Sequence, residues 1–520
     1  MSPAIRNTVI RNTLYSFIGR FWTLIVGVLL VPYIISMIGL ERFGIWALFS
    51  ILTGYFALLD FGIGLSYTRF IAESYTQGNN EEINRIVNSG FVFYSLVSIV
   101  ILIIAVTMRR WIFSFLNIDE RLFPDLMPAY YGTLVIFLFS ASLSGFTSVL
   151  QGLQKLDIVN KIAVVVTLMN AVATIIFLRS GFRLDGLMWS SAITTTIGLS
   201  VSLLFVKRYF PPVRFKPTLF SLVTIKKLLS FGMKLQFSKF FGLITFQADK
   251  AIVSFFTGPE SVGYYQIGSQ IVLRTRDIPV LLLASIIPAA SELHARDEQR
   301  KLIDVYERGT KYLAAIGIPA MILLAVTTQF LIKGWMGAGY RISGIISQIL
   351  VAGYLVNALT GVGAATAAGM NRPNFEWHAA IVSIVSNLTL VFLLGKFFGV
   401  YGIAVAGTIS LVIGAIYFLV HFHKFINIPV MRFLKTTMAY PFIISLYIAI
   451  IFWVLNTLVV KRFNYVGRLP NLAVVGVEAV LFLSIYGYAI YRSSFFDEVD
   501  KELFLNNYLL SKVRRLFRFV

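Results

Sequence analysis

Apolar stretches of about 20 residues recur along the whole chain, separated by short polar connections. Each stretch is long enough to cross about 30 Å of hydrocarbon at about 1.5 Å of helix rise per residue. Only 13% of the 520 residues are charged, which is too few to cover the surface of a water-soluble protein of this length. The sequence therefore predicts an all-α membrane protein that crosses the bilayer many times.

We expect about 14 transmembrane helices. The predicted spans are residues 13–36, 43–67, 86–108, 127–150, 157–178, 186–206, 231–256, 262–290, 308–330, 343–369, 376–396, 399–420, 436–458 and 470–491. The connections between them are short, and none is long enough to form a folded domain outside the bilayer.

The positively charged residues lie mainly in these short connections. The net charge is +21, and Lys and Arg are most frequent in alternate connections, above all in 207–230. The positive-inside rule assigns such loops to the cytoplasm, which places both termini there. Because the cations are divided among short loops, a nucleic-acid-binding surface is excluded. The absence of cysteine excludes disulfide and thiol chemistry.

An internal repeat organises the chain. At one constant offset the matched pairs are Arg20 and Lys239, Glu41 and Glu260, Gly44 and Gly263, Trp46 and Tyr265, Glu73 and Glu292, and Gly90 and Gly309. After a shift of two, the pairs are Gly152 and Gly369, Lys155 and Arg372, and Asn170 and Asn387. Each copy holds an even number of helices, so both copies cross the membrane in the same sense.

The repeat predicts two parallel six-helix lobes and two further helices. The predicted parts are an N-terminal lobe (1–206), a basic cytoplasmic linker (207–230), a C-terminal lobe (231–420), helices 13 and 14 (421–491) and a cytoplasmic tail (492–520). Pairs of lobes related in this way place the substrate path at their interface.

Charged residues inside the predicted spans are the candidate site. A charge at the bilayer centre costs about 3 kcal/mol, so it is kept only where water, a partner or a substrate offsets that cost. The candidate substrate-binding cations are Arg20, Lys239, Lys250, Arg274 and Arg276. The candidate cavity or coupling acids are Asp60 and Asp277. They concentrate in the first two helices of each lobe, where they would line a central cationic cavity.

Each candidate also has a structural interpretation. Arg274 and Asp277 are spaced to form an ion pair that fixes helix packing. The long side chains of Arg20 and Lys239 can reach the headgroup region from within two or three turns of the surface. Asp60 is either a proton or cation site or a hydrogen-bond acceptor between helices. The glycines that follow Asp60 permit a close helix approach or a local break.

Other functional patterns are weak. His294, His378, His421 and His423 lack metal-ligand spacing, and no phosphate-binding glycine loop precedes a Lys-Ser/Thr pair. We therefore expect no metal, no cofactor and no ATP-driven mechanism. The aromatic residues Trp22, Trp46, Tyr55, Tyr264 and Tyr265 mostly fit an interfacial belt, with stacking on sugars as the alternative.

Four segments resemble the Wzx-type flippases for bacterial polysaccharide and O-antigen. They are residues 39–46 (GLERFGIW), 59–64 (LDFGIG), 68–73 (TRFIAE) and 150–157 (LQGLQKLD). This family belongs to the multidrug/oligosaccharidyl-lipid/polysaccharide exporter superfamily, whose MATE-like fold has two six-helix lobes. The resemblance implies export of a polyprenyl-pyrophosphate-linked oligosaccharide across the inner membrane, with membrane lipids and polysaccharide-assembly proteins as partners. It also implies that Arg20 and Arg274 lie in cation-bearing lumen helices and Asp60 in the matching acidic motif.

The chemistry of the candidate residues agrees with such a cargo. Arg binds phosphate oxygens through paired hydrogen bonds and Lys binds them as a point charge. A drug or cation antiporter of the same superfamily is the first alternative, but it would favour an acidic lumen, and these helices carry more Lys and Arg than Asp. A polytopic glycan polymerase or ligase is the second, and it would need catalytic residues on larger outer loops. We therefore predict a transporter, not an enzyme.

Overall fold

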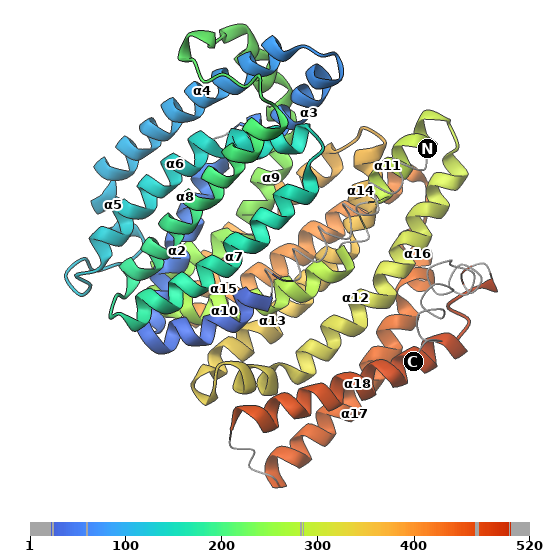
Figure 1. Cartoon of the computed structure of the whole chain (residues 1–520). Coiled ribbons are helices and arrows are strands. Elements are labelled where there is room, and N and C mark those ends of the chain that lie inside the picture. The colour runs from blue at the N-terminus through green and yellow to red at the C-terminus, as the bar shows by residue number, and fades with distance from the viewer. Residues whose placement is uncertain are drawn as a thin grey trace, which may run out of the picture. The chain divides into compact units, whose positions relative to one another are not determined.

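The computed structural model describes residues 22, 25–58, 61–280, 283, 285–462, 467–498 and 500. Within these residues the secondary structure is helical, without a strand (Figure 1). The chain divides into two compact units, Met1–Gln266 and Ile267–Val520, with the limit inside helix α10. The predicted all-α membrane fold is confirmed, while the number of 14 spans stays a prediction.

The first unit holds the helices up to the start of α10. They are Ile25–Ile38, α2 (Leu40–Ala57), α3 (Ile63–Thr76), α4 (Asn80–Thr107), α5 (Arg109–Phe115), α6 (Leu126–Gly152), α7 (Leu156–Arg179), α8 (Leu184–Tyr209), η2 (Pro217–Leu219) and α9 (Leu222–Thr257). Helix α10 (Pro259–Val280) begins in this unit and continues from Ile267 in the second. A buried cluster that includes Tyr67, Ile86, Val149 and Leu228 joins α3, α4, α6 and α9. Tyr67 fits there because Gly90 has no side chain: a Cβ on Gly90 would lie 1.4 Å from the tyrosine oxygen.

The second unit holds the remaining helices. They are α11 (Ile286–Ala295), α12 (Gln299–Trp335), η4 (Ala338–Tyr340), α13 (Arg341–Leu359), α14 (Gly361–Gly369), α15 (Asn374–Ile426), α16 (Val430–Thr437), α17 (Ala439–Arg462) and α18 (Arg468–Arg492). Helices α17 and α18 lie side by side, and both pack against α12 (Figure 1).

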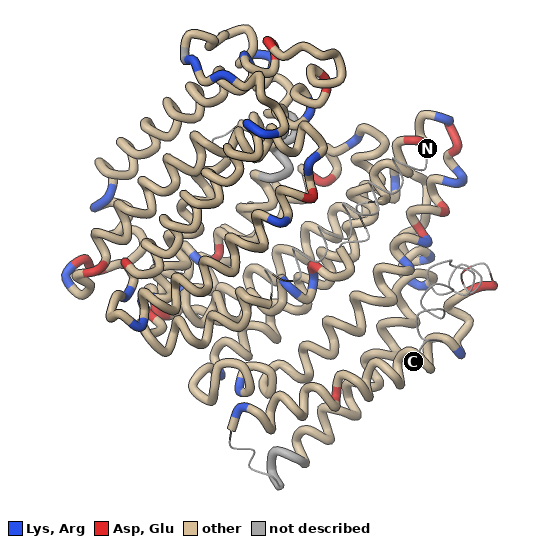
Figure 2. The backbone as a smooth tube through the Cα atoms, viewed as in Figure 1, with Lys and Arg blue, Asp and Glu red and all other residues tan. Residues whose placement is uncertain are grey.

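The surfaces of the helices fit a lipid environment. Nine helices in the described part of the chain are long and apolar enough to cross a membrane. Helix α7 exposes Val165, Val172 and Ile176, each by more than half. In both units the charged positions gather toward the helix ends and are sparse along the middle (Figure 2). Apolar outer faces with charged ends are what a lipid bilayer requires of a multi-pass protein.

Several predicted spans are broken helices. The span predicted at 43–67 divides into α2 and α3, where Phe61 (φ 50°) and Gly62 (φ 75°) leave the helical conformation. A Cβ on Gly62 would lie 2.2 Å from the carbonyl oxygen of Gly232, so the glycine also permits a close contact with α9. The segment therefore provides both the break and the close approach that its two glycines permit. The span predicted at 262–290 likewise divides into α10 and α11.

The sequence repeat has a counterpart in the backbone. Gly39 precedes α2 at φ 84° and ψ 164°, and its repeat partner Gly258 precedes α10 at φ 82° and ψ 172°. Gln154 (φ 60°) and Asn371 (φ 58°) form the same turn after α6 and α14. These turns support the repeat. The compact units follow packing, not the repeat, so the predicted lobe limits stay a prediction.

The repeated helix starts of α2 and α10 also contact each other within the first unit. A Cβ on Gly44 would lie 1.9 Å from the carbonyl oxygen of Pro259. A Cβ on Gly263 would lie 2.8 Å from the carbonyl oxygen of Leu40. Leu40 and Pro259 are themselves matched by the repeat offset. The contact is therefore reciprocal, as expected around a pseudo-twofold axis.

Candidate functional site

The structure locates four of the seven candidate residues in full. Lys250, Arg274, Arg276 and Asp277 are described with their side chains, whereas Arg20 and Asp60 lie outside the described residues. Lys239 is placed as a position within α9. The functional roles of all seven residues stay predictions.

Lys250 belongs to a buried polar cluster in the first unit. Its ammonium donates a hydrogen bond to Oε1 of Gln247 at 2.5 Å, and Asp249 directly precedes it on α9. Asp249 in turn accepts a 2.7 Å hydrogen bond from the hydroxyl of Tyr265 on α10. Lys250 is 4% exposed and Asp249 5% exposed. A buried ammonium is tolerated where polar partners replace water, and this cluster supplies them.

Helix α10 carries the second charged cluster, in the second unit. Nη1 of Arg274 lies 3.9 Å from Oδ2 of Asp277, and Nη1 of Arg276 lies 3.8 Å from Oδ1 of the same carboxylate. Nη2 of Arg276 donates a 2.9 Å hydrogen bond to Oδ1 of Asn357 on α13. Arg274 and Asp277 are both 49% exposed, whereas Arg276 is 17% exposed. Two guanidinium groups thus share one carboxylate, which leaves one positive charge in excess.

The ion pair considered as the structural interpretation of Arg274 and Asp277 is present. Its 3.9 Å separation is close to the outer limit for an ion pair, and both side chains remain half exposed. An exposed pair of this kind contributes little to stability, about 0–1 kcal/mol. Arg274 therefore keeps donors available for a further anionic group.

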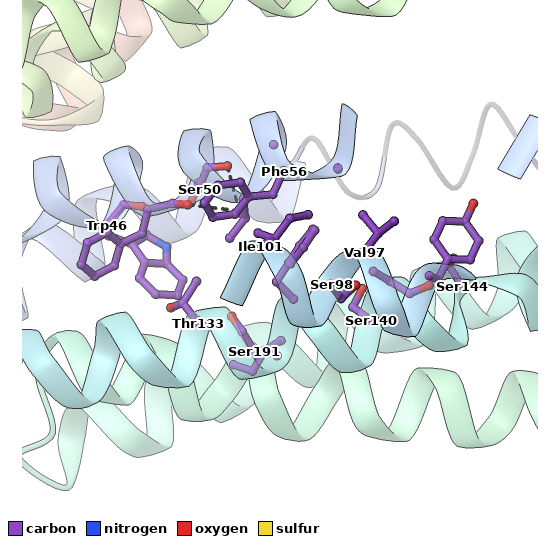
Figure 3. A pocket seen from close by; sticks show the side chains of 18 residues that line it. Trp46, Ser50, Phe56, Val97, Ser98, Ile101, Thr133, Ser140, Ser144 and Ser191 are labelled. Atoms are coloured by element: carbon purple, nitrogen blue, oxygen red, sulfur yellow. Dashed lines mark hydrogen bonds between the residues drawn. The ribbon is translucent and has the colours of Figure 1, made fainter. Parts of the chain in front are cut away.

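A cavity of about 540 Å³ lies within the first unit, between α2, α4, α6 and α8 (Figure 3). Its lining combines aromatic side chains, among them Trp46 and Phe137, with serine and threonine hydroxyls. None of the described lining residues is charged. The sequence pointed to Trp46 as an aromatic residue of interest but not to the cavity, because the helices that form it are separated along the chain.

Two further polar contacts were missed from the sequence. Asn456 on α17 donates a 3.5 Å hydrogen bond to Oε2 of Glu478 on α18, and both side chains are buried. Glu478 is the single charged residue in the predicted span 470–491, so its position was a visible signal. Asn357 is likewise a polar residue in the mostly apolar helix α13. Among the described residues, no group of three His, Asp or Glu side chains is arranged to hold a metal ion.

Comparison with known proteins identifies the family. Residues 9–294, more than half of the chain, match the family described as "Polysaccharide biosynthesis protein". A "Putative O-antigen transporter" of Shigella flexneri is 21% identical over 412 residues, which cover 79% of this chain and 96% of the relative. A "Probable low-salt glycan biosynthesis flippase Agl15" of Haloferax volcanii is 21% identical over 453 residues, which cover 86% and 90%.

A solved structure with the same fold is the lipid II flippase MurJ in an inward closed conformation. The TM-score is 0.66 at 18% sequence identity, with 93% of this chain and 99% of that structure covered. The family match and the named relatives confirm the resemblance to polysaccharide flippases, and those relatives are transporters, not enzymes. The chain is thus a multi-pass membrane protein that belongs to the polysaccharide biosynthesis protein family.

Proposed function

We propose that the protein is a flippase for a lipid-linked oligosaccharide. Its cargo is a polyprenyl-pyrophosphate-linked repeat unit of a polysaccharide, which it moves from the cytoplasmic to the outer leaflet of a bacterial inner membrane. The O-antigen transporter and the glycan flippase among its relatives support this function. The proposed partners are the membrane lipids and the proteins that assemble the polysaccharide.

The charge arrangement on α10 is the observation that carries the proposal. Arg274 and Arg276 share the single carboxylate of Asp277, and Arg274 is half exposed. A guanidinium group offers paired N–H donors whose spacing matches phosphate oxygens. A pyrophosphate that replaces or joins Asp277 would therefore bind the half-exposed guanidinium of Arg274 more closely than Asp277 does at 3.9 Å.

The remaining candidates are assigned to the same path. In this proposal Arg20, Lys239 and Lys250 bind the anionic headgroup at other stages of transport, and Asp60 and Asp277 are the cavity or coupling acids. The headgroup passes through a cationic cavity that opens alternately to the two sides of the membrane. Charged side chains along the path replace the water that an anion loses on entering a low-dielectric environment.

Transport by purified protein in vesicles provides the test. The assay measures how fast lipid-linked oligosaccharide becomes accessible on the opposite leaflet. Arg274→Gln removes charge-assisted hydrogen bonds worth about 1.5–3 kcal/mol, so we expect a loss of about tenfold or more in rate. Arg274→Lys keeps the charge without the paired donors. We expect its transport rate to lie between that of the unaltered protein and that of Arg274→Gln.

Arg296→Gln is the matched control. Arg296 follows α11, is 63% exposed and pairs with Glu292 at 2.7 Å, so its loss should leave transport unchanged. Normal transport by Arg274→Gln, and by Arg274→Gln combined with Lys250→Gln at normal protein levels, would contradict the cationic path. Absence of transport by the unaltered protein would contradict the flippase function itself.

A further inference from the structure

We propose that the cavity between α2, α4, α6 and α8 is a binding subsite for uncharged sugars of the glycan. The proposal rests on the proposed function, because it assigns a second part of the same cargo to a second place on the protein. The charged cluster on α10 is suited to the pyrophosphate, whereas the described lining of this cavity is uncharged and is suited to the sugars. Four observations on the cavity carry the inference: its size, its neutrality, the state of its hydroxyl groups and its aromatic walls.

The cavity has the dimensions of a small-molecule site. Its volume of about 540 Å³ falls within the range of about 300–1,000 Å³ that is usual for ligand pockets. Figure 3 shows α2 presenting Trp46, Ser50 and Phe56 on one side, with hydroxyls of α4 and α6 on the other. All the described residues that line the cavity belong to the first unit.

Hydroxyl groups give the cavity its polarity. They belong to Ser50, Thr53, Ser98, Thr133, Ser140, Ser144 and Ser191. Because the described lining has no charged side chain, the cavity offers no opposite charge to a phosphate or to a cationic drug. A sugar hydroxyl is both donor and acceptor, as are these side chains, so the two sets of groups match.

The lining hydroxyls fall into two groups. Some donate to carbonyl oxygens of their own helices: Thr53 donates to Phe49 at 3.1 Å and Thr133 to Ala129 at 2.7 Å. These hydroxyls retain their oxygen lone pairs as acceptors toward the cavity. Within the described part of the chain, Ser98, Ser140 and Ser191 make no side-chain hydrogen bond, so they supply donors as well.

Ser98 is the most informative of these residues. It lies in the apolar helix α4 and is only 2% exposed, yet it faces the cavity without a hydrogen-bond partner among the described residues. Hydroxyls inside proteins are usually hydrogen-bonded, because an unmet donor costs free energy. The oxygen of Ser98 is not among the fully enclosed unpartnered atoms of the described residues, so this hydroxyl is open to the cavity. Serines that only promote helix packing satisfy this rule within the protein, as the pair Ser95 and Ser142 does at 3.3 Å. A polar ligand or water in the cavity would satisfy Ser98.

Aromatic side chains complete the match to a sugar. Trp46, Phe49, Phe56, Tyr94 and Phe137 line the cavity, and the rings of Phe56 and Phe137 pack 5.7 Å apart. A pyranose ring presents C–H groups on its faces and hydroxyls around its edge. Aromatic walls with hydroxyls between them therefore suit both parts of the ring.

Transport of two different cargoes distinguishes the sugar subsite from the flippase function. The first is the full lipid-linked oligosaccharide, and the second is the same polyprenyl pyrophosphate carrying one sugar only. Ser98→Ala combined with Ser140→Ala removes two hydroxyls without adding bulk to the cavity. Each lost neutral hydrogen bond weakens binding by about fivefold, so we expect about a 25-fold loss for the full cargo at limiting concentration. The single-sugar cargo should stay within about twofold, since its charged headgroup lies elsewhere.

Two controls guard the interpretation. Thr196→Val alters an exposed hydroxyl on α8 that bonds to Ala192 at 2.8 Å and lies outside the cavity, so both cargoes should move normally. Ser191→Ala is a milder cavity variant in case the double substitution does not fold, and it should lower transport of the full cargo by about fivefold. Equal losses for both cargoes, or no loss for either, would overturn the sugar subsite.

A binding measurement decides the matter if the unaltered protein moves neither cargo, which would refute the flippase function. The probe is then the oligosaccharide released from its lipid, titrated onto protein in lipid nanodiscs. Saturable binding that Ser98→Ala with Ser140→Ala weakens by at least about tenfold supports the subsite. Absence of binding, or binding that the variants leave unchanged, overturns it.

Discussion

Asp125 shows what a single carboxylate does outside the membrane. It lies just before α6 and accepts hydrogen bonds from Nε of Arg42 at 3.1 Å and from the backbone amide of Leu184 at 3.0 Å. Burial by itself raises the pKa of Asp125, but these two contacts outweigh it and hold the pKa below its ordinary value. One side chain thereby ties the starts of α2, α6 and α8 together.

Asp125 should make stability depend on acid pH. Because its folded pKa lies below the unfolded value of about 3.9, its contribution is fully present above that value and is lost as pH falls through the folded pKa. Asp125→Asn should cost about 1–3 kcal/mol near pH 7 and lose less on acidification than the unaltered protein. Thermal unfolding in detergent between pH 7 and pH 3 measures this difference. Asp119→Asn, in the exposed loop before it, serves as the control, and identical pH profiles for Asp125→Asn and the unaltered protein would contradict the prediction.

At this scale the sequence located charges but not their partners. Lys250, Arg274, Arg276 and Asp277 stood out because charged residues are rare in apolar spans. The partner of Arg276 is Asn357, 81 residues away, and no local pattern indicates that contact. The cavity around Ser98 was missed for the same reason. Serine is common in membrane helices, and only the packed helices show which serines meet.

At the scale of elements, the segment after α18 is fixed to α12 by the buried carboxylate of Asp500 and by an ion pair between Asp497 and Arg308 at 3.2 Å. Asp500 is completely buried and lies 2.7 Å from Nη1 of Arg308 and 2.5 Å from Nζ of Lys311. The hydroxyl of Tyr312 also donates to it at 2.5 Å. Burial raises the pKa of Asp500, but the bonds from Lys311 and Tyr312 prevail and lower it to about 2. The carboxylate therefore stays ionised at any physiological pH.

Asp500→Asn should release this segment. The substitution leaves Lys311 without its carboxylate partner, while Arg308 keeps Asp304 and Asp497, so we expect a cost of about 3 kcal/mol. We expect faster proteolysis after α18 and a lower unfolding temperature, both measurable on purified protein in detergent. Glu498→Gln, at an exposed position two residues earlier, is the matched control. Unchanged proteolysis of Asp500→Asn would show that other contacts hold the segment.

Helix positions were predictable and helix continuity was not. Hydropathy locates apolar stretches, but it does not register the backbone angles at which a helix stops. The spans predicted at 262–290 and 343–369 are therefore each two helices, with the second divided between α13 and α14. A glycine marks one such break. The spans predicted at 376–396 and 399–420 are joined in α15, and Gly399 at their junction has non-helical backbone angles (φ 55°, ψ −136°).

At the scale of the whole molecule, transport of the proposed cargo is electrogenic, because it moves net charge across the membrane. An anionic headgroup that crosses the membrane carries charge, and an inside-negative potential favours its export by about 2.3 kcal/mol per charge per 100 mV. Imposing a potassium diffusion potential on vesicles should accelerate transport in the direction that favours the anion and slow it when the sign is reversed. Collapse of the potential is the control. Equal rates at both signs would contradict net movement of charge.

The two copies of the repeat have the same backbone conformation at matched positions but differ in the side-chain contacts that they make. The backbone at Gly39 matches that at Gly258 within a few degrees of φ. Seven residues further along each copy, the indole of Trp46 borders an uncharged cavity and the phenol of Tyr265 holds a carboxylate. Duplicated architecture can therefore diverge in its recognition chemistry while its geometry is conserved. Such a protein has charged groups and an uncharged cavity with which to bind a molecule that is ionic at one end and uncharged at the other.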